Sequence, residues 1–381
     1  MPDMLIRAGT LITPLQTFEN TELEVRGGRI ASIRPPSGRR PDIDASDRIV
    51  APGYIDIHVH GGDGLDTMDG TYDAIAGMAK HLARHGVTSF LAATLTAPWD
   101  EIRAALSAVR EAMSRGTGGA ECLGAHLEGP FINPGKPGAQ ALEHIRQPSV
   151  AEMEPELGDL IDVIRVVTLA PEMPSAVELI RYLVGRGITV SLGHTDAVFA
   201  EAISAFEAGA RNVTHIFNAM RPLHHREPGV IGAALWDDRV RAEMIWDNVH
   251  LHPAVAEVAA RAKGPERVAL VSDAMRAAGL PDGTYTLGAY TVSVRGGEAR
   301  LSDGTIAGST LTLDQAVRNA AARLSPADAI RMAAETPARA AGVAGRKGRL
   351  DPGCDADILI LTPDLEVEQV LIAGQRFPAL S

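Results

Sequence analysis

The middle of the chain alternates short β-rich runs with alanine-rich helical segments, and this alternation constrains the fold more than any other feature. It is typical of βα units whose strands form a parallel sheet. Helical patterns lie between most of the runs, at 72–84, 99–115, 175–186 and 198–208. Strands are predicted at 54–60, 87–94, 122–129, 163–170, 188–194, 212–216, 241–246 and 267–272. Eight such units close into a (β/α)8 TIM-type barrel.

A dinucleotide-binding sheet is the main alternative for such a pattern. That fold needs a glycine-rich phosphate turn of defined spacing after its first strand. The glycines that follow the first predicted strand, Gly61-Gly62-Asp63-Gly64, lack this spacing and come after His58-Val59-His60. The barrel is therefore favoured.

The two ends of the chain have a different pattern. Residues 21–34 hold two β-rich runs around Gly27-Gly28, which is a hairpin signal. Strand-like runs recur near the other end, at 356–360 and 371–375. We expect residues 1–52 and 346–381 to form one small β-sandwich domain, and residues 53–345 to form the barrel.

Charge and cysteine content limit the partners and the location. The chain has 36 basic and 48 acidic residues, a net charge of −12. This disfavours nucleic acid and anionic membranes, and a bound phosphate needs a local cationic pocket. Two cysteines make no disulfide framework, which indicates a reducing cytoplasm. The N-terminal residues lack the apolar core of a signal peptide, and no apolar run approaches the roughly 18 residues of a membrane span.

Imidazoles and carboxylates gather at the ends of five predicted strands. Barrel enzymes place their chemistry at the carboxyl ends of the strands. The residues found there are His58 and His60, Glu128, His194, His215 and Asp273. Each histidine alone is more often a hydrogen-bonded core residue. Together, in this pattern, they predict a site for one or two divalent cations, because imidazole and carboxylate are suitable ligands.

Glu128 is the anionic residue available to bridge two cations. Some metal-binding barrels bridge two metals with a carboxylated lysine on a strand. None of the four lysines here lies at a predicted strand end, which argues against such a bridge; they are Lys80, Lys136, Lys263 and Lys347. A bound cation lowers the pKa of a bound water to about 7 and makes hydroxide available. Asp273 can then move the proton from the water to a leaving nitrogen. The alternative is that Asp273 caps a helix or orients a histidine. Zinc is the first expectation, with iron, manganese, cobalt or nickel also compatible.

Several longer motifs resemble those of the amidohydrolase superfamily and, within it, of the N-acetylglucosamine-6-phosphate deacetylases. APGYIDIHVHG (51–61) and GCDAD (353–357) are typical of the whole superfamily. HLEGPFIN (126–133), HIFNAM (215–220) and REPG (226–229) single out the deacetylases. GHT (193–195), SDAM (272–275) and AGS (307–309) continue the match, which covers nearly the whole chain.

The resemblance implies hydrolysis of the acetamide of N-acetylglucosamine 6-phosphate to glucosamine 6-phosphate and acetate. It implies that Glu128, His194 and His215 are the main metal ligands, that His58, His60 and Asp273 hold a second metal in dinuclear members, and that Asp273 is the catalytic acid and base. It also implies a homodimer in which Arg226 reaches the neighbouring active site. The substrate-binding positions implied are Ala139, Gln140, Asn218, Ala219, Arg226, Asp247, His250, Ile306, Ala307 and Gly308.

One residue departs from this pattern, and the substrate stays open. Gln140 stands where many members have a histidine, and an amide can donate a hydrogen bond but cannot be cationic. The alternatives are a deacetylase for another phosphorylated amino sugar such as the galactosamine epimer, a cyclic-amide amidohydrolase, or a barrel without catalytic activity. His81 and His85, four residues apart, are expected to lie on a helix face rather than in a metal site.

Overall fold

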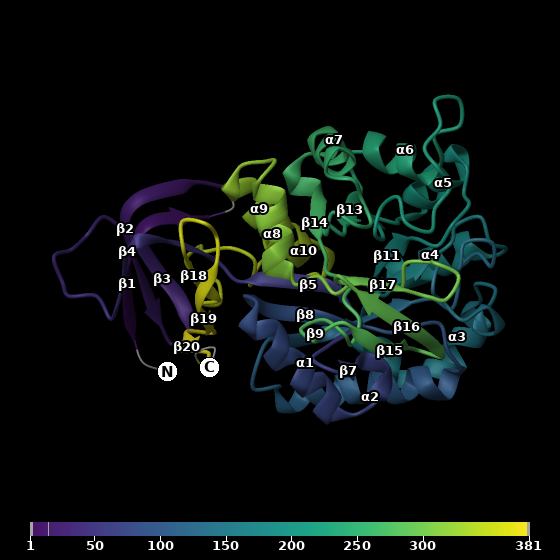
Figure 1. Cartoon of the computed structure of the whole chain (residues 1–381), viewed down its shortest axis with the longest axis horizontal. Coiled ribbons are helices and arrows are strands. Elements are labelled where there is room, and N and C mark those ends of the chain that lie inside the picture. The colour runs from purple at the N-terminus through teal and green to yellow at the C-terminus, as the bar shows by residue number, and fades with distance from the viewer. Residues whose placement is uncertain (1–2, 14, 379–381) are drawn as a thin grey trace.

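The computed structural model describes residues 3–13 and 15–378, and a parallel barrel is its largest part (Figure 1). Its strands run in the order of the chain, each parallel to the next. The ring closes where the Asp273 amide donates to the His58 carbonyl, 2.9 Å away. The strands are β5 (Tyr54–Val59), β8 (Val87–Ala93), β9 (Glu121–Glu128), β10 (Ile164–Leu169), β11 (Thr189–Leu192), β12 (Asn212–Val213), β13 (Arg241–Met244) and β14 (Val268–Leu270). The predicted barrel is confirmed.

Helices cover the outside of the barrel (Figure 1). The predicted helices are present as α1 (Tyr72–Arg84), α2 (Trp99–Arg115), α4 (Ala176–Gly185) and α5 (Phe199–Ala208). The others are α3 (Val150–Leu157), α6 (Gly229–Trp236), α7 (Pro253–Lys263), α8 (Leu313–Ala321), α9 (Pro326–Ala333) and α10 (Glu335–Ala340), with 3-10 turns at Thr67–Asp69, Leu142–His144, Gly158–Val163 and Pro265–Arg267. Among the described residues no helix combines the length and the apolar character needed to cross a membrane.

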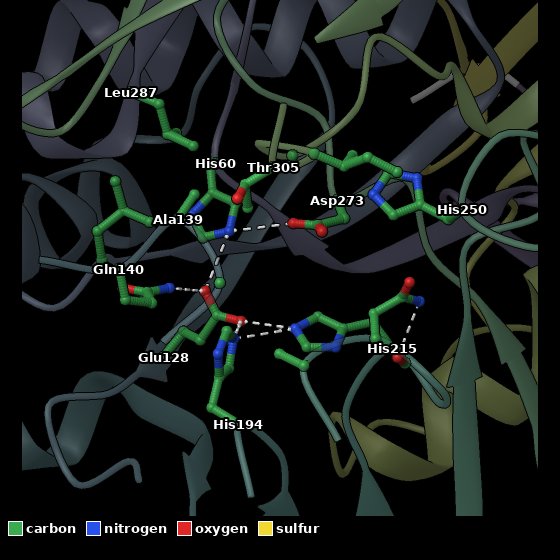
Figure 2. A pocket seen from close by; sticks show the side chains of 16 residues that line it. His60, Glu128, Ala139, Gln140, His194, His215, His250, Asp273, Leu287 and Thr305 are labelled. Carbon is green, nitrogen blue, oxygen red and sulfur yellow. Dashed lines mark hydrogen bonds and ion pairs between the residues drawn. The ribbon is translucent and has the colours of Figure 1, made fainter. Parts of the chain in front are cut away.

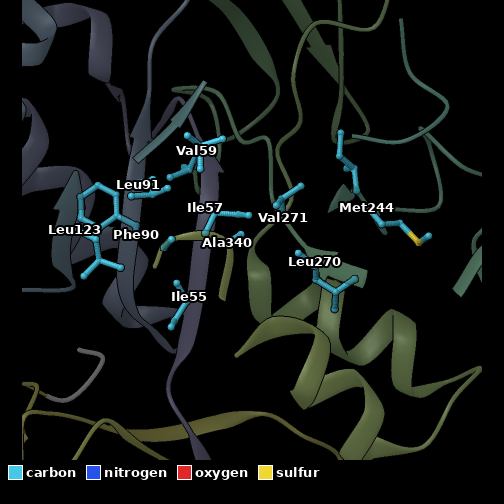
Figure 3. Close-up of a cluster of buried hydrophobic side chains, with 14 of the residues drawn as sticks. Ile55, Ile57, Val59, Phe90, Leu91, Leu123, Met244, Leu270, Val271 and Ala340 are labelled. Atoms are coloured by element: carbon cyan, nitrogen blue, oxygen red, sulfur yellow. The ribbon is translucent and has the colours of Figure 1, made fainter. Parts of the chain in front are cut away.

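The core lies between the strands and these helices (Figure 3). On β5 the buried apolar residues Ile55, Ile57 and Val59 alternate with Asp56 and His58. Successive side chains of a strand point to opposite faces. The apolar residues therefore pack in the core, and the polar ones face the interior of the barrel.

Both ends of the chain contribute strands to a second sheet beside the barrel (Figure 1). The order is β20-β19-β18-β4-β1-β2-β3, with β1 and β4 parallel and the other pairs antiparallel. These strands are β1 (Met4–Ile12), β2 (Thr17–Arg26), β3 (Arg29–Arg34), β4 (Ile43–Pro52), β18 (Ile358–Leu361), β19 (Val367–Ile372) and β20 (Gln375–Arg376). The predicted hairpin is confirmed, since Gly27 and Gly28 join β2 to β3 with φ of 57° and 80°.

The small sheet curls around its own apolar core. The amide of Ile30 donates to the carbonyl of Cys354, and the amide of Ala356 donates to that of Gly28, both at 2.9 Å. Residues of β1, β2, β4, β18 and β19 share one buried cluster. The small β domain is confirmed as a product of both chain ends. Its boundaries at residues 52/53 and 345/346 stay a prediction, and residues 1–2 and 379–381 lie outside the described part.

A buried lysine joins the small sheet to the barrel. Lys347 Nζ lies 2.6 Å from a carboxylate oxygen of Asp357, next to β18, and 2.8 Å from one of Glu121, the first residue of β9. Lys347 is only 1% exposed. Buried charges are stable only when they are paired in this way. The ion cluster therefore fixes the contact between the two parts of the chain.

A small antiparallel sheet follows the last barrel strand and lies outside the predicted units. It consists of β15 (Gly283–Leu287), β16 (Tyr290–Arg295) and β17 (Glu298–Arg300), while β6 (Gly61–Gly62) and β7 (Leu65–Asp66) form a separate pair. The apolar face of the three-stranded sheet packs against Leu95 and Met275, which follow barrel strands β8 and β14. The insertion therefore stands over the carboxyl ends of the strands.

Candidate active site

The predicted imidazoles and carboxylates meet at the carboxyl ends of the barrel strands (Figure 2). His58 belongs to β5 and Glu128 is the last residue of β9, whereas His60, His194, His215 and Asp273 come one to three residues after their strands. All of these side chains are buried. The parallel strands thus bring residues from across the sequence into one cluster.

Glu128 lies at the centre of this cluster. Its Oε1 is 3.1 Å from His194 Nε2 and 3.0 Å from His215 Nε2, and these two nitrogens are 3.2 Å apart. Ligand atoms of a tetrahedral zinc ion with bonds of about 2.0–2.1 Å are separated by about 3.3 Å. The donor set and its spacing therefore fit a divalent cation.

A second group of donors lies on the other side of Glu128. The Nε2 atoms of His58 and His60 are 3.3 Å apart, and Asp273 Oδ1 is 3.2 Å from His60 Nε2 and 3.6 Å from His58 Nε2. Glu128 Oε2 is itself 3.3 Å from His60 Nε2. Glu128 thus contacts both groups, as a carboxylate shared by two cations would.

The electrostatics of the cluster favour positive charge. Burial opposes protonation of His60, but Asp273 and Glu128 outweigh it and raise the pKa of His60 to about 9. Burial likewise opposes ionisation of Asp273, yet His58 and His60 lower its pKa to about 2. Two ionised carboxylates in a buried site attract protons to the imidazoles, and they attract a metal cation for the same reason.

The backbone is strained at three of these residues. His194, His215 and Asp273 have φ of 48°, 26° and 49°, in a region that costs non-glycine residues about 1–3 kcal/mol each. Neighbouring segments hold this conformation: the His194 carbonyl accepts from the Asn133 amide at 2.9 Å, and the Asp273 carbonyl accepts from the Ser309 amide at 2.8 Å. Strain that persists in this way is typical of functional sites.

A pocket of about 330 Å³ opens above the cluster (Figure 2). Most of the predicted substrate positions line it, namely Ala139, Gln140, Asn218, Ala219, His250, Ile306 and Gly308. Ala307 instead packs into the apolar cluster under the inserted sheet. Asp247 supports a lining residue, because its Oδ2 lies 2.6 Å from His250 Nδ1.

Arg226 lies in an exposed loop. Its guanidinium contacts His225 Nε2 at 2.8 Å, and His224 and His225 beside it are exposed as well. This placement leaves Arg226 available to a neighbouring molecule, and its predicted role in a partner's active site stays a prediction.

Four lining residues were not predicted. Leu95, Gly138, Leu287 and Thr305 complete the wall of the pocket. Leu287 and Thr305 come from the inserted sheet and the loop that follows it. Leucine and threonine give no chemical signal in a sequence, so only the position of the insertion identifies them.

Comparison with known proteins agrees with this geometry. The model of the amidohydrolase family matches residues 49–377. The chain belongs to the amidohydrolase family. This amidohydrolase is 42% identical to the N-acetylgalactosamine-6-phosphate deacetylase of Escherichia coli O157:H7, over 97% of the chain and 98% of the relative. It is also 42% identical to the N-acetylglucosamine-6-phosphate deacetylase of Bacillus subtilis (strain 168), over 97% and 96%.

Solved structures give the same result. A mutant of the N-acetyl-D-glucosamine-6-phosphate deacetylase from Mycobacterium smegmatis, in complex with N-acetyl-D-glucosamine-6-phosphate, superposes with a TM-score of 0.93. It is 34% identical in sequence, and the match covers 99% of this amidohydrolase and all of that chain. The resemblance drawn from the sequence motifs, and the barrel it implied, are confirmed.

Gln140 connects the pocket wall to the cluster. Its Oε1 accepts from the Thr96 amide at 2.7 Å, which directs its Nε2 to donate to Glu128 Oε2 at 2.5 Å. We expect Gln140→Leu to lower turnover about 10–100-fold, because Glu128 is a predicted metal ligand and the partner that orients such a ligand typically contributes that much. The rate of acetate release by the purified variant, compared with that of the wild-type protein, checks this result. Gln140→Glu keeps an oxygen for Thr96 but loses the donor to Glu128, so wild-type turnover in that variant would contradict the role of the donor.

Proposed function

We propose that this amidohydrolase removes the acetyl group of N-acetyl-D-glucosamine 6-phosphate, giving D-glucosamine 6-phosphate and acetate. The observation that carries the proposal is the buried cluster around Glu128, with two imidazole pairs and Asp273 at the base of a pocket. Relatives at 36–42% identity over nearly the full chain are deacetylases of amino-sugar 6-phosphates. The geometry and the relatives therefore support the same reaction.

The proposed metal ligands are Glu128, His194 and His215, with His58, His60 and Asp273 for a second cation. Zinc is the first candidate, since the donor spacing suits a tetrahedral ion. Iron, manganese, cobalt and nickel accept the same ligands. A divalent cation held by these residues would supply Lewis-acid chemistry, polarising the acetyl carbonyl and lowering the pKa of a water.

Asp273 is the proposed proton carrier of the reaction. The same imidazoles that lower its pKa keep the carboxylate ionised, so it can accept a proton at neutral pH. It takes the proton of the attacking water as the oxygen adds to the acetyl carbon. It then donates this proton to the nitrogen as the carbon–nitrogen bond breaks, and the products are acetate and the free amine.

The remaining pocket residues are proposed to hold the sugar phosphate. Asn218 and Ala219 follow β12 and line one wall, and Asp247 fixes the His250 ring in another. Ile306 and Gly308 belong to the loop after the inserted sheet, and both residues line the pocket. In a protein of net charge −12, Arg226 and His250 are the proposed local source of positive charge for the phosphate.

Acetate release from purified protein tests the proposed function. N-acetylglucosamine 6-phosphate, its galactosamine epimer and unphosphorylated N-acetylglucosamine are compared, and metal content is measured on the same sample. We expect a phosphorylated sugar to be the preferred substrate and at least one divalent cation per chain. The equal identity to deacetylases of both epimers keeps N-acetylgalactosamine 6-phosphate as the second candidate. Turnover of a cyclic amide without turnover of either sugar phosphate would contradict the proposal.

We further propose a homodimer in which Arg226 completes the partner's site. The exposed apolar residues Leu223, Trp236, Val255 and Val258 lie on the loop of Arg226 and on α6 and α7, which supports a contact between copies there. Apolar surface of this kind is frequent at interfaces. Oligomeric state in solution is the first check.

Mixing two inactive variants tests the role of Arg226. Arg226→Ala and Asp273→Asn are each expected to be nearly inactive alone. In a randomly mixed dimer one site regains both residues, so the mixture is expected to reach about a quarter of wild-type activity. Activity no higher than the sum of the two variants would show that Arg226 acts within its own chain or not at all.

The cysteines support the predicted cytoplasmic location. Cys122 and Cys354 are free thiols, and both are buried. Unpaired cysteines of this kind are common in reducing compartments.

A further inference from the structure

A continuous chain of buried hydrogen bonds runs around the barrel interior beneath the proposed metal site, and its two ends lie on the neighbouring residues His58 and Ile57. It starts at His58 Nδ1, 3.0 Å from Glu243 Oε2 on β13, and Glu243 Oε1 is 2.7 Å from Asn212 Nδ2. From Asn212 the chain continues through three hydroxyl groups, with distances of 3.1 Å from Asn212 to Ser191, 2.6 Å from Ser191 to Thr214 and 2.7 Å from Thr214 to Thr168. It ends at His126, whose Nε2 lies 2.7 Å from Thr168 and whose Nδ1 lies 2.9 Å from the carbonyl of Ile57. These side chains are fully buried, so no water competes for the bonds.

The protons of this chain have one consistent arrangement. The amide nitrogen of Asn212 only donates, and it gives one hydrogen to Glu243 and the other to the oxygen of Ser191. The hydroxyl of Ser191 then has a single remaining partner, Thr214, to which it donates.

The same assignment of donors and acceptors continues from Thr214 to His126. Since Thr214 accepts from Ser191, its own hydrogen goes to Thr168. The hydrogen of Thr168 then goes to His126 Nε2, which leaves His126 Nδ1 to donate to the Ile57 carbonyl. A carbonyl oxygen only accepts, so the last bond agrees with the direction set by Asn212.

Glu243 is the acceptor from which this arrangement begins. Its Oε1 accepts from Asn212, and its Oε2 also lies 3.4 Å from the backbone amide of His215. With donors at both oxygens, the carboxylate accepts from His58 as well. His58 therefore carries a proton on Nδ1, which leaves Nε2, 3.4 Å from Glu128 Oε1 and 3.6 Å from Asp273 Oδ1, as the nitrogen that can give up its proton to a metal.

We propose that Glu243 is a positioning residue that holds His58 as the Nδ1–H tautomer, with Nε2 turned toward the proposed second cation. The inference rests on the proposed metal centre for its function, whereas the tautomer itself follows from the hydrogen-bond chain. Only an imidazole nitrogen without a proton can bind a metal. Glu243 thus determines whether His58 can act as a ligand at all.

A direct test reads the tautomer in the wild-type protein. Nitrogen-15 NMR of histidine-labelled protein distinguishes protonated from unprotonated ring nitrogens, and the signal lost in His58→Gln assigns His58. We expect a proton on Nδ1 with or without metal, and none on Nε2 once zinc is bound. An unprotonated Nδ1 would overturn the proposal. The proton on Nδ1 does not depend on bound metal, so a protein that binds none would contradict the proposed metal centre and leave the role of Glu243 to be decided by the Nδ1 signal.

A second test changes Glu243 to Gln. The new amide presents an NH2 group either to Asn212, which is also a donor, or to His58 Nδ1, which then has to accept. We expect zinc titration to show about 10–100-fold weaker binding of the second equivalent. Binding at Glu128, His194 and His215 should change by less than threefold, as read from the first equivalent.

Thr168→Val is the matched control for the Glu243 variant. It removes a buried hydrogen bond of the same chain at a residue that is hydrogen-bonded to neither His58 nor Glu243, and it should lower thermal stability while leaving both zinc affinities within about threefold of wild type. Equal loss of zinc in both variants, or unchanged zinc binding in Glu243→Gln, would overturn the positioning role. If Glu243→Gln does not fold, the tautomer of the wild-type protein decides.

Discussion

Turnover of the Asp273→Asn variant is expected to fall about 10²–10⁴-fold, while the bound metal stays nearly intact. Asparagine has the shape of aspartate and retains one oxygen, so it can occupy the position 3.2 Å from His60 Nε2. It cannot accept a proton from the attacking water. The substitution therefore removes the proton transfer and preserves most of the cluster.

Rates of acetate release and metal content of the same preparation provide the measurement. Asp237→Asn is the matched control, because Asp237 is a buried aspartate at the end of α6 whose carboxylate pairs with Arg239 rather than with the cluster. This control should keep wild-type turnover. An Asp273→Asn enzyme of full activity would exclude Asp273 as the acid and base.

The His194→Ala variant is expected to lose its metal and about 10³-fold or more in turnover, since a Lewis acid contributes several kcal/mol to such a reaction. His194 Nε2 lies within 3.2 Å of both Glu128 Oε1 and His215 Nε2. Its Nδ1 is 3.0 Å from the Lys136 carbonyl, which fixes the ring. Alanine removes one of the three proposed ligands, and we expect the other two to be unable to hold the cation on their own.

Metal content and turnover of the His194→Ala variant are compared with those of His81→Ala. His81 is a buried imidazole on α1 whose ring lies beside that of His85, 5.0 Å away, and burial lowers its pKa to about 4. This control tests whether loss of any buried imidazole releases metal, and we expect it to keep wild-type metal content. A His194→Ala protein with normal metal and normal turnover would refute the proposed ligand set.

The barrel was predictable because its signals are local. Strand β8 is a fully buried, largely apolar run, and it is followed by helix α2, whose buried residues repeat with helical spacing. The polar ends of runs like this one carry Glu128 and the histidines, and parallel strands bring such ends to one rim. The shared motifs added the expected substrate positions, most of which line the pocket.

The remaining features depend on contacts between distant segments. The inserted sheet of β15, β16 and β17 is fixed by packing on Leu95 and Met275, and nothing within its own residues predicts that site. The direction of the Gln140 amide is determined by the backbone of Thr96, which follows another strand. Glu243 lies within the predicted strand at 241–246, but nothing in the sequence indicates that it pairs with His58.

The sheet made from both chain ends also imposes an order on synthesis. The edge of β4 that pairs with β18 leaves the ribosome roughly 300 residues before its partner strand. During that interval the backbone groups of residues 49–52 lack their final neighbours, and an unpaired edge invites association with other chains. Maturation of this enzyme is therefore completed only after translation of its last strands, and shortening the carboxyl terminus before β18 is expected to yield aggregates rather than a barrel with a missing appendage.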